Sequence, residues 1–85
     1  MNISKLEQRV LHVLAQGGLI RHERGEGRKI SAVTCYTRDG LVLSDCDLTL
    51  FRRLRARRLI ASGGGAPYRI SRRGLAAVRG QLDNQ

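Results

Sequence analysis

The sequence predicts a small α+β domain of winged-helix type, because an amphipathic helical stretch runs directly into a hairpin pattern with a glycine-rich tip. The helical stretch follows Asp45, and the hairpin pattern ends near Ser71. The chain's 85 residues suffice for one modest hydrophobic core. We therefore expect a single domain over residues 1–85, with the element order α-β-β-β-α-β-β-α.

The first helix is predicted by a capping box, in which Ser4 is followed three residues later by Glu7. Apolar residues recur at helical spacing after this point, and Gly17 and Gly18 favour the left-handed turn that ends a helix. The predicted apolar stripe consists of Ile3, Leu6, Val10, Val13 and Leu14.

Three short strands are predicted next. Residues 19–24 and 28–37 flank a glycine-containing turn, and the second of them carries the β-branched side chains typical of strands. A tight turn at Asp39–Gly40 then leads to an apolar run at residues 41–43. This pattern indicates an antiparallel meander, where a common winged helix has a further helix.

The central helix has two distinct faces. By the 3.6-residue period, its apolar face holds Leu48, Leu50, Phe51 and Leu54. The opposite face holds Thr49, Arg52, Arg53 and Ala56. Ser44 or Asp45 is placed to cap the first turn, and the arginines at the other end suit the negative end of the helix dipole. A partner would meet the face that carries Arg52 and Arg53.

The rest of the chain predicts a hairpin and a last helix. Strands are expected at residues 59–62 and 68–71, across a flexible tip of three consecutive glycines. Ser71 is placed to cap the helix, whose narrow apolar stripe is Leu75, Val78 and Leu82. Gly74 and Gly80 each weaken this helix by about 1 kcal/mol relative to alanine, so it must rely on packing.

The charge distribution favours an anionic partner. Sixteen Lys and Arg residues against seven Asp and Glu residues give a net charge of +9, and no acidic residue lies between Asp47 and Asp83. The alternative is a solvated face whose arginine stems cover the edge of the core. The expected surface for an acidic protein or for double-stranded DNA consists of Thr49, Arg52, Arg53, Arg57, Arg69, Arg72 and Arg73.

The sequence offers little support for a metal site, a cofactor or catalysis. The candidate ligands His12, His22, Cys35 and Cys46 lack the paired spacing of a zinc site, and no motif links either cysteine to a base. Without an export signal or a membrane-spanning run, we expect a cytoplasmic protein with reduced cysteines packed as small hydrophobes. We therefore expect a binding protein that is not an enzyme and uses no cofactor.

Six runs, spread in order over nearly the whole chain, carry a family resemblance. They are LHVLAQGG at 11–18, CYTRDG at 35–40, LSDC at 43–46, FRRLR at 51–55, PYRIS at 67–71 and GLAAVRGQLDN at 74–84. Together they resemble the YjhX toxin family of bacteria. The resemblance implies a toxin of a toxin–antitoxin pair that binds and inhibits DNA topoisomerase I, raises negative supercoiling and suppresses growth. It also implies an antitoxin protein as a partner, and it implies no catalytic residue.

The same residues leave a second function open. A winged-helix transcriptional regulator would present the same helix face to duplex DNA. That face carries no Asn or Gln to read adenine, so its arginines favour phosphate contacts over base readout. The two functions differ in whether the main partner is a protein or the duplex.

Overall fold

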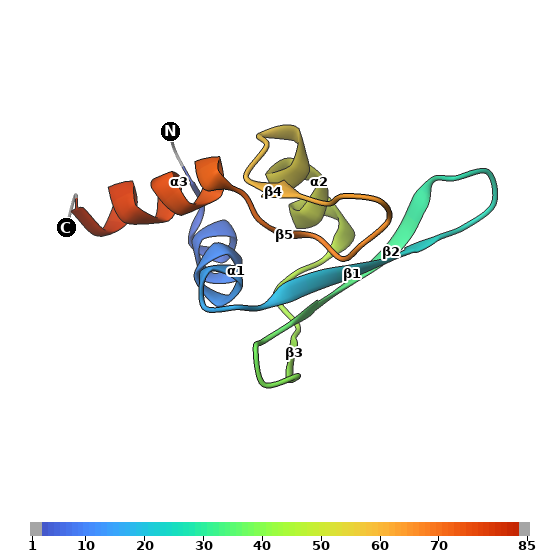
Figure 1. Ribbon diagram of the computed structural model, residues 1–85, viewed down its shortest axis with the longest axis horizontal. Helices are drawn as coiled ribbons and strands as arrows, with labels where there is room; N and C mark the ends of the chain where they lie inside the picture. The colour runs from blue at the N-terminus through green and yellow to red at the C-terminus, as the bar shows by residue number, and fades with distance from the viewer. Residues whose placement is uncertain (1–2, 84–85) are drawn as a thin grey trace.

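The computed structural model describes residues 3–83, with side chains described up to residue 80. Its elements, in chain order, are α1 (Lys5–Ala15), β1 (Leu19–Arg24), β2 (Ile30–Tyr36), β3 (Val42–Leu43), α2 (Leu48–Ala56), β4 (Ile60–Ala61), β5 (Arg69–Ile70) and α3 (Arg72–Asp83) (Figure 1). The α+β class and the predicted element order are confirmed. None of the described helices combines the length and the apolar character needed to cross a membrane.

Two antiparallel sheets lie next to each other. Strands β1, β2 and β3 form a meander in that order, and β4 pairs with β5. The sheets meet where Ile20 pairs with Tyr68, and each backbone N–H donates to the other residue's carbonyl, at 2.9 and 2.8 Å. The chain just before β5 therefore continues the meander along the free edge of β1.

Helix α1 begins as predicted, but its buried face differs from the predicted apolar stripe. The Ser4 hydroxyl accepts a hydrogen bond from the Glu7 N–H at 3.1 Å, so the cap is confirmed. The expected position of Leu6 in the apolar stripe is wrong, because Leu6 is 50% exposed while Leu11 is fully buried. The buried face includes Glu7, whose carboxylate turns inward to an arginine of the chain segment after α2.

Helix α2 is capped two residues after Asp45, the later of the two predicted caps. Asp47, and not Ser44 or Asp45, is the N-cap, and its carboxylate accepts from the Leu50 N–H at 2.8 Å. Asp45 is instead engaged by the Arg9 guanidinium at 2.9 Å, which ties α1 to the approach of α2. The predicted inner face is confirmed, with Leu50, Phe51 and Leu54 buried.

Helix α3 starts at the predicted cap and packs through a glycine. The Gly74 N–H donates to the Ser71 hydroxyl at 3.0 Å. A Cβ on Gly74 would lie 2.2 Å from the Leu59 carbonyl oxygen, so the helix approaches the chain before β4 closely. Val78 is buried as predicted, but Leu75 is 37% exposed, and the close contact with Leu59 is made by Gly74. The Leu82 side chain lies outside the described residues.

Candidate functional site

Helix α2 ends in a Schellman motif with an arginine where glycine is usual. The Leu59 N–H donates to the Leu54 carbonyl at 3.0 Å, six residues apart counted inclusively. The Arg58 N–H donates to the Arg55 carbonyl, also at 3.0 Å. Arg58 has a φ of +60°, a left-handed conformation that costs a residue with a Cβ about 1–2 kcal/mol. The exposed Arg58 side chain therefore occupies a position that backbone energetics would give to glycine.

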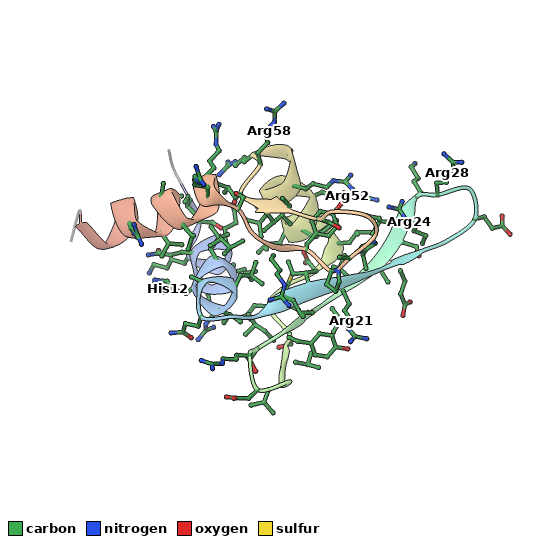
Figure 2. All side chains as sticks on the ribbon, in the orientation of Figure 1. His12, Arg21, Arg24, Arg28, Arg52 and Arg58 are labelled. Carbon is green, nitrogen blue, oxygen red and sulfur yellow. The ribbon has the colours of Figure 1, made fainter. Side chains whose placement is uncertain are left out.

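This helix end meets the start of α3. The Ser71 hydroxyl donates to the Arg58 carbonyl at 2.7 Å and accepts from the first turn of α3. Because Arg72 and Arg73 follow Ser71 directly, both exposed side chains start close to Arg58, which Figure 2 shows at the end of α2. We call this group the basic junction; its members are Arg57, Arg58, Arg72 and Arg73.

Two members of the basic junction destabilise helix α3, in whose first turn they lie. Arg72 and Arg73 occupy the first turn of α3, which contains no acidic residue. The N-terminus of a helix carries a partial positive charge, so each arginine costs about 0.3–1 kcal/mol there. Three arginines of the basic junction, counting Arg58, thus stand where an arginine lowers the stability of the fold.

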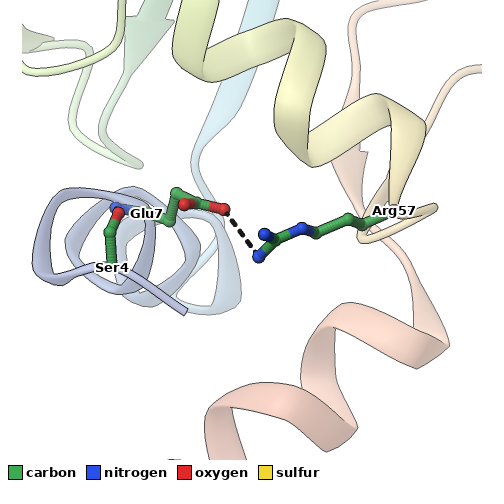
Figure 3. Close-up of polar contacts among 3 residues, drawn as sticks. All are labelled: Ser4, Glu7 and Arg57. Carbon is green, nitrogen blue, oxygen red and sulfur yellow. Dashed lines mark hydrogen bonds and ion pairs between the residues drawn. The ribbon is translucent and has the colours of Figure 1, made fainter. Parts of the chain in front are cut away.

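Arg57 is different, because it has a partner inside the chain. Its Nη1 lies 3.3 Å from Oε2 of Glu7, and the two side chains are 40% and 3% exposed (Figure 3). A buried carboxylate without a partner would be costly, so Arg57 stabilises the contact between α1 and the end of α2. Arg57 belongs to the contact surface that the sequence predicts, but its pairing with Glu7 was not predicted.

The outer face of α2 extends this surface. Thr49, Arg52 and Arg53 are exposed, on the side of the helix opposite to the buried Phe51. Figure 2 shows Arg52 on the flank of α2 and Arg58 beyond its end. The structure therefore presents most of the predicted cationic residues along α2 and at the adjoining start of α3.

Arg69 lies in a different place. It lines a hollow of about 500 Å³ whose described lining belongs to β1, β2, β5 and the adjoining turns and includes no residue of α2. Besides two glycines, the hollow is lined by Leu19, Arg21, Tyr36, Thr37, Arg38 and Arg69. The predicted set is thus divided between two surfaces. Strand alternation is the signal that separates Arg69 from the helix, because its neighbours Tyr68 and Ile70 pack against the core.

The two cysteines lie away from both surfaces, in the core. Cys35 and Cys46 are buried free thiols in contact, as expected for small hydrophobes. The Cys46 thiol hydrogen-bonds to Cys35, which raises the pKa of Cys46 and lowers that of Cys35; burial raises the pKa of Cys46 further. Within the part of the chain that the structure describes, no three side chains of His, Cys, Asp or Glu come together as metal ligands would.

Known proteins match the chain over its full length. A family model described as "Putative toxin of bacterial toxin-antitoxin pair" matches residues 1–85. The UPF0386 protein of Rhodospirillum rubrum is 67% identical over 85 residues, which are 100% of this chain and 94% of that protein. The UPF0386 proteins of Parvibaculum lavamentivorans and Cereibacter sphaeroides are each 64% identical over the whole chain, covering 100% and 98% of their own lengths. No solved structure matches the chain, so its likeness to a winged helix stays a prediction.

Proposed function

The chain belongs to the YjhX toxin family, and on this premise we propose that it inhibits DNA topoisomerase I by binding the enzyme through the basic junction and the outer face of α2. The target is what the family resemblance implies, and the surface is inferred from the geometry. One observation carries the choice of surface: Arg58, Arg72 and Arg73 are all exposed at positions where arginine opposes folding. A binding role explains their presence where stability does not.

The chemistry of this surface suits carboxylates and phosphates. Guanidinium groups bind both in a bidentate manner, and they are more weakly hydrated than lysine ammonium groups. Topoisomerase I binds DNA, so a cationic toxin would act by docking on an acidic surface of the enzyme, by bridging enzyme and DNA, or by competing for the DNA. As a toxin of a pair, the chain would have a second partner, the antitoxin that restrains it.

The deciding experiment is the relaxation of negatively supercoiled plasmid by purified topoisomerase I, with increasing amounts of this protein. The salt concentration is set where a parallel assay shows that binding to duplex DNA is lost, because phosphate contacts weaken steeply with salt. We expect inhibition at amounts close to one protein per enzyme. Inhibition only at concentrations that coat the DNA would contradict the proposal and favour the transcriptional regulator.

Charge-matched variants then locate the surface. Two double variants, Arg72→Gln with Arg73→Gln and Arg52→Gln with Arg53→Gln, remove two positive charges each from the proposed contact. Each should raise the half-inhibitory concentration about tenfold, which corresponds to about 1.4 kcal/mol of lost interface contacts. The control, Arg28→Gln with Lys29→Gln, removes the same charge from the exposed turn after β1 and should inhibit normally. An equal loss in the control would show that only net charge matters.

A further inference from the structure

The meander has an open face with its own cationic hollow. Along β1 and β2, the side chains of Ile20 and Cys35 point into the core, while Arg21 and Tyr36 alternate with them and line the hollow. In Figure 1 the three helices lie above or beside β1 and β2, and only the β3 segment lies below. Figure 2 shows Arg21 on the side of β1 away from α2.

The hollow combines a flat stacking surface with positive charge. The Arg21 guanidinium carbon lies 5.8 Å from the centroid of the Tyr36 ring, which is a cation–π contact. Arg38, from the turn after β2, and Arg69, from β5, complete three guanidinium groups, and no carboxylate is among the described lining residues. Three such cations suit an anionic ligand, and the adjacent carboxylate, Asp39, lines a separate hollow with Arg38.

Two exposed apolar residues follow the lining residue Gly40 in the chain. They are Leu41 and Val42, which are 68% and 61% exposed. Val42 pairs with Tyr36 across β2 and β3, so its side chain lies on the same open face. The face therefore offers an aromatic ring, aliphatic side chains and arginines together.

We propose that this open face binds single-stranded DNA, with a base stacked on the Arg21–Tyr36 pair and phosphates paired with Arg38 and Arg69. Unpaired bases expose flat apolar surfaces next to phosphates, and proteins bind them with aromatic and arginine stacking platforms in cationic grooves. A duplex keeps its bases stacked inside. An acidic peptide would pair its carboxylates with the arginines but has no base to stack on the Arg21–Tyr36 pair.

The lining offers few hydrogen-bond acceptors to a ribose 2′-hydroxyl. The guanidinium groups only donate hydrogen bonds, and the described lining contains no carboxylate or amide side chain to accept one from a ribose 2′-hydroxyl. The Thr37 hydroxyl oxygen already accepts a hydrogen bond from the Leu41 N–H at 3.0 Å. A ribose 2′-hydroxyl would meet guanidinium donors here but few side-chain acceptors, so its own O–H would go largely unused and a deoxyribose strand loses little.

This inference is independent of the proposed enzyme target. The basic junction and the open face share no residue, and binding to DNA is measured on the protein alone. A failure to inhibit topoisomerase I would leave the open face untouched, and a failure to bind single strands would leave the basic junction untouched. If both hold, the toxin would meet the enzyme at a separated DNA strand.

The test is fluorescence anisotropy of the full chain with a labelled oligothymidylate of about 12 nucleotides, beside a duplex of the same length at the same salt. We expect the single strand to bind more tightly than the duplex. Arg69→Gln and Tyr36→Leu should each weaken binding of the single strand about tenfold. Arg52→Gln removes the same charge from α2 as Arg69→Gln removes from the hollow, and it should change that affinity by about twofold or less.

Several results would overturn the proposal. They are equal affinity for single strand and duplex, equal effects of Arg69→Gln and Arg52→Gln, or tighter binding of an oligouridylate. Competition by polyglutamate as effective as that by oligothymidylate would assign the open face to an acidic protein instead. Because Tyr36 is partly buried, thermal unfolding accompanies each variant; if Tyr36→Leu does not fold, the exposed double variant Arg21→Gln with Arg69→Gln takes its place.

Discussion

The charged residues at the two ends of helix α2 differ in how they affect the stability of the fold. At the N-terminal end, Asp47 caps the helix and Asp45 pairs with Arg9, so negative charge lies at the positive end of the dipole. At the C-terminal end, Arg58 is held in a left-handed conformation, and it sits beside Arg72 at the positive end of α3. The charges at the first end lower the free energy of the fold, whereas the second end combines the favourable Glu7–Arg57 pair with arginines whose backbone or position raises it.

This difference indicates which charges serve stability and which call for another explanation. The arginines of α2 itself lie near the negative end of a helix, where cations are favourable, so exposure and charge alone do not mark them as functional. Arg72 and Arg73 have no such benefit, because they lie at the positive end of α3, and at Arg58 the benefit is opposed by the left-handed backbone. The contrast is therefore a sharper guide to the contact surface than net charge, and three changes of sequence test it.

The largest effect is expected for Gly74→Ala, which attacks the packing that brings α3 to the end of α2. The added methyl group would meet the Leu59 carbonyl oxygen at 2.2 Å and the Ile70 side chain at 2.7 Å, so backbone must move. Overpacking of this kind, less the gain in helix propensity, should lower the free energy of unfolding by about 3 kcal/mol. Urea unfolding followed by circular dichroism measures it.

Gly80→Ala is the matched control for this change. It makes the same substitution in the same helix, at a position where a Cβ meets nothing within 4 Å. The protein should gain up to about 1 kcal/mol from the better helix former. If the two variants are equally stable, the close approach of α3 to Leu59 does not exist, and the basic junction is not a fixed surface.

The second largest effect is expected for Arg57, and it distinguishes an arginine that stabilises the fold from one that serves only a partner. Arg57→Ala leaves the buried Glu7 carboxylate without its ion-pair partner at 3.3 Å, so the free energy of unfolding should fall by about 2 kcal/mol. Arg53→Ala, on the exposed face of the same helix, should stay within about 0.5 kcal/mol of the parent. Similar stability of the two variants would return Arg57 to the contact surface as a solvated cation.

Most of the fold was predictable because its signals are local. The Ser4 and Ser71 caps, the turn at Asp39–Gly40 and the inner face of α2 each depend on residues within one or two turns of each other. The N-cap of α2 was not predictable in this way, because several side chains that could accept the capping hydrogen bond precede the helix. Arg9, distant in sequence, engages Asp45, and Asp47 is left to cap.

The candidate site was less predictable, because its division depends on long-range contacts. The 3.6-residue period places Arg52 and Arg53 outward, and the structure agrees. It could not pair Arg57 with Glu7 across 50 positions, nor place Arg69 with Arg21 in one hollow. The left-handed conformation of Arg58 could have been predicted from the sequence. Many helices end with a left-handed residue, and no glycine is available for that position before Leu59.

The smallest effect on stability, with the clearest consequence for function, is expected for Arg58→Gly. Glycine relieves the strain at φ +60°, so the protein should become more stable by about 0.5–1 kcal/mol while its inhibition of topoisomerase I weakens. Arg28→Gly is the matched control, because Arg28 is also an exposed arginine with positive φ, at +101°, but lies in the turn after β1. Thermal unfolding and plasmid relaxation are measured on both variants. A gain in stability for both, with loss of inhibition only for Arg58→Gly, would show that arginine is kept at the end of α2 for the partner; normal inhibition by both would leave the strain at Arg58 without a binding role.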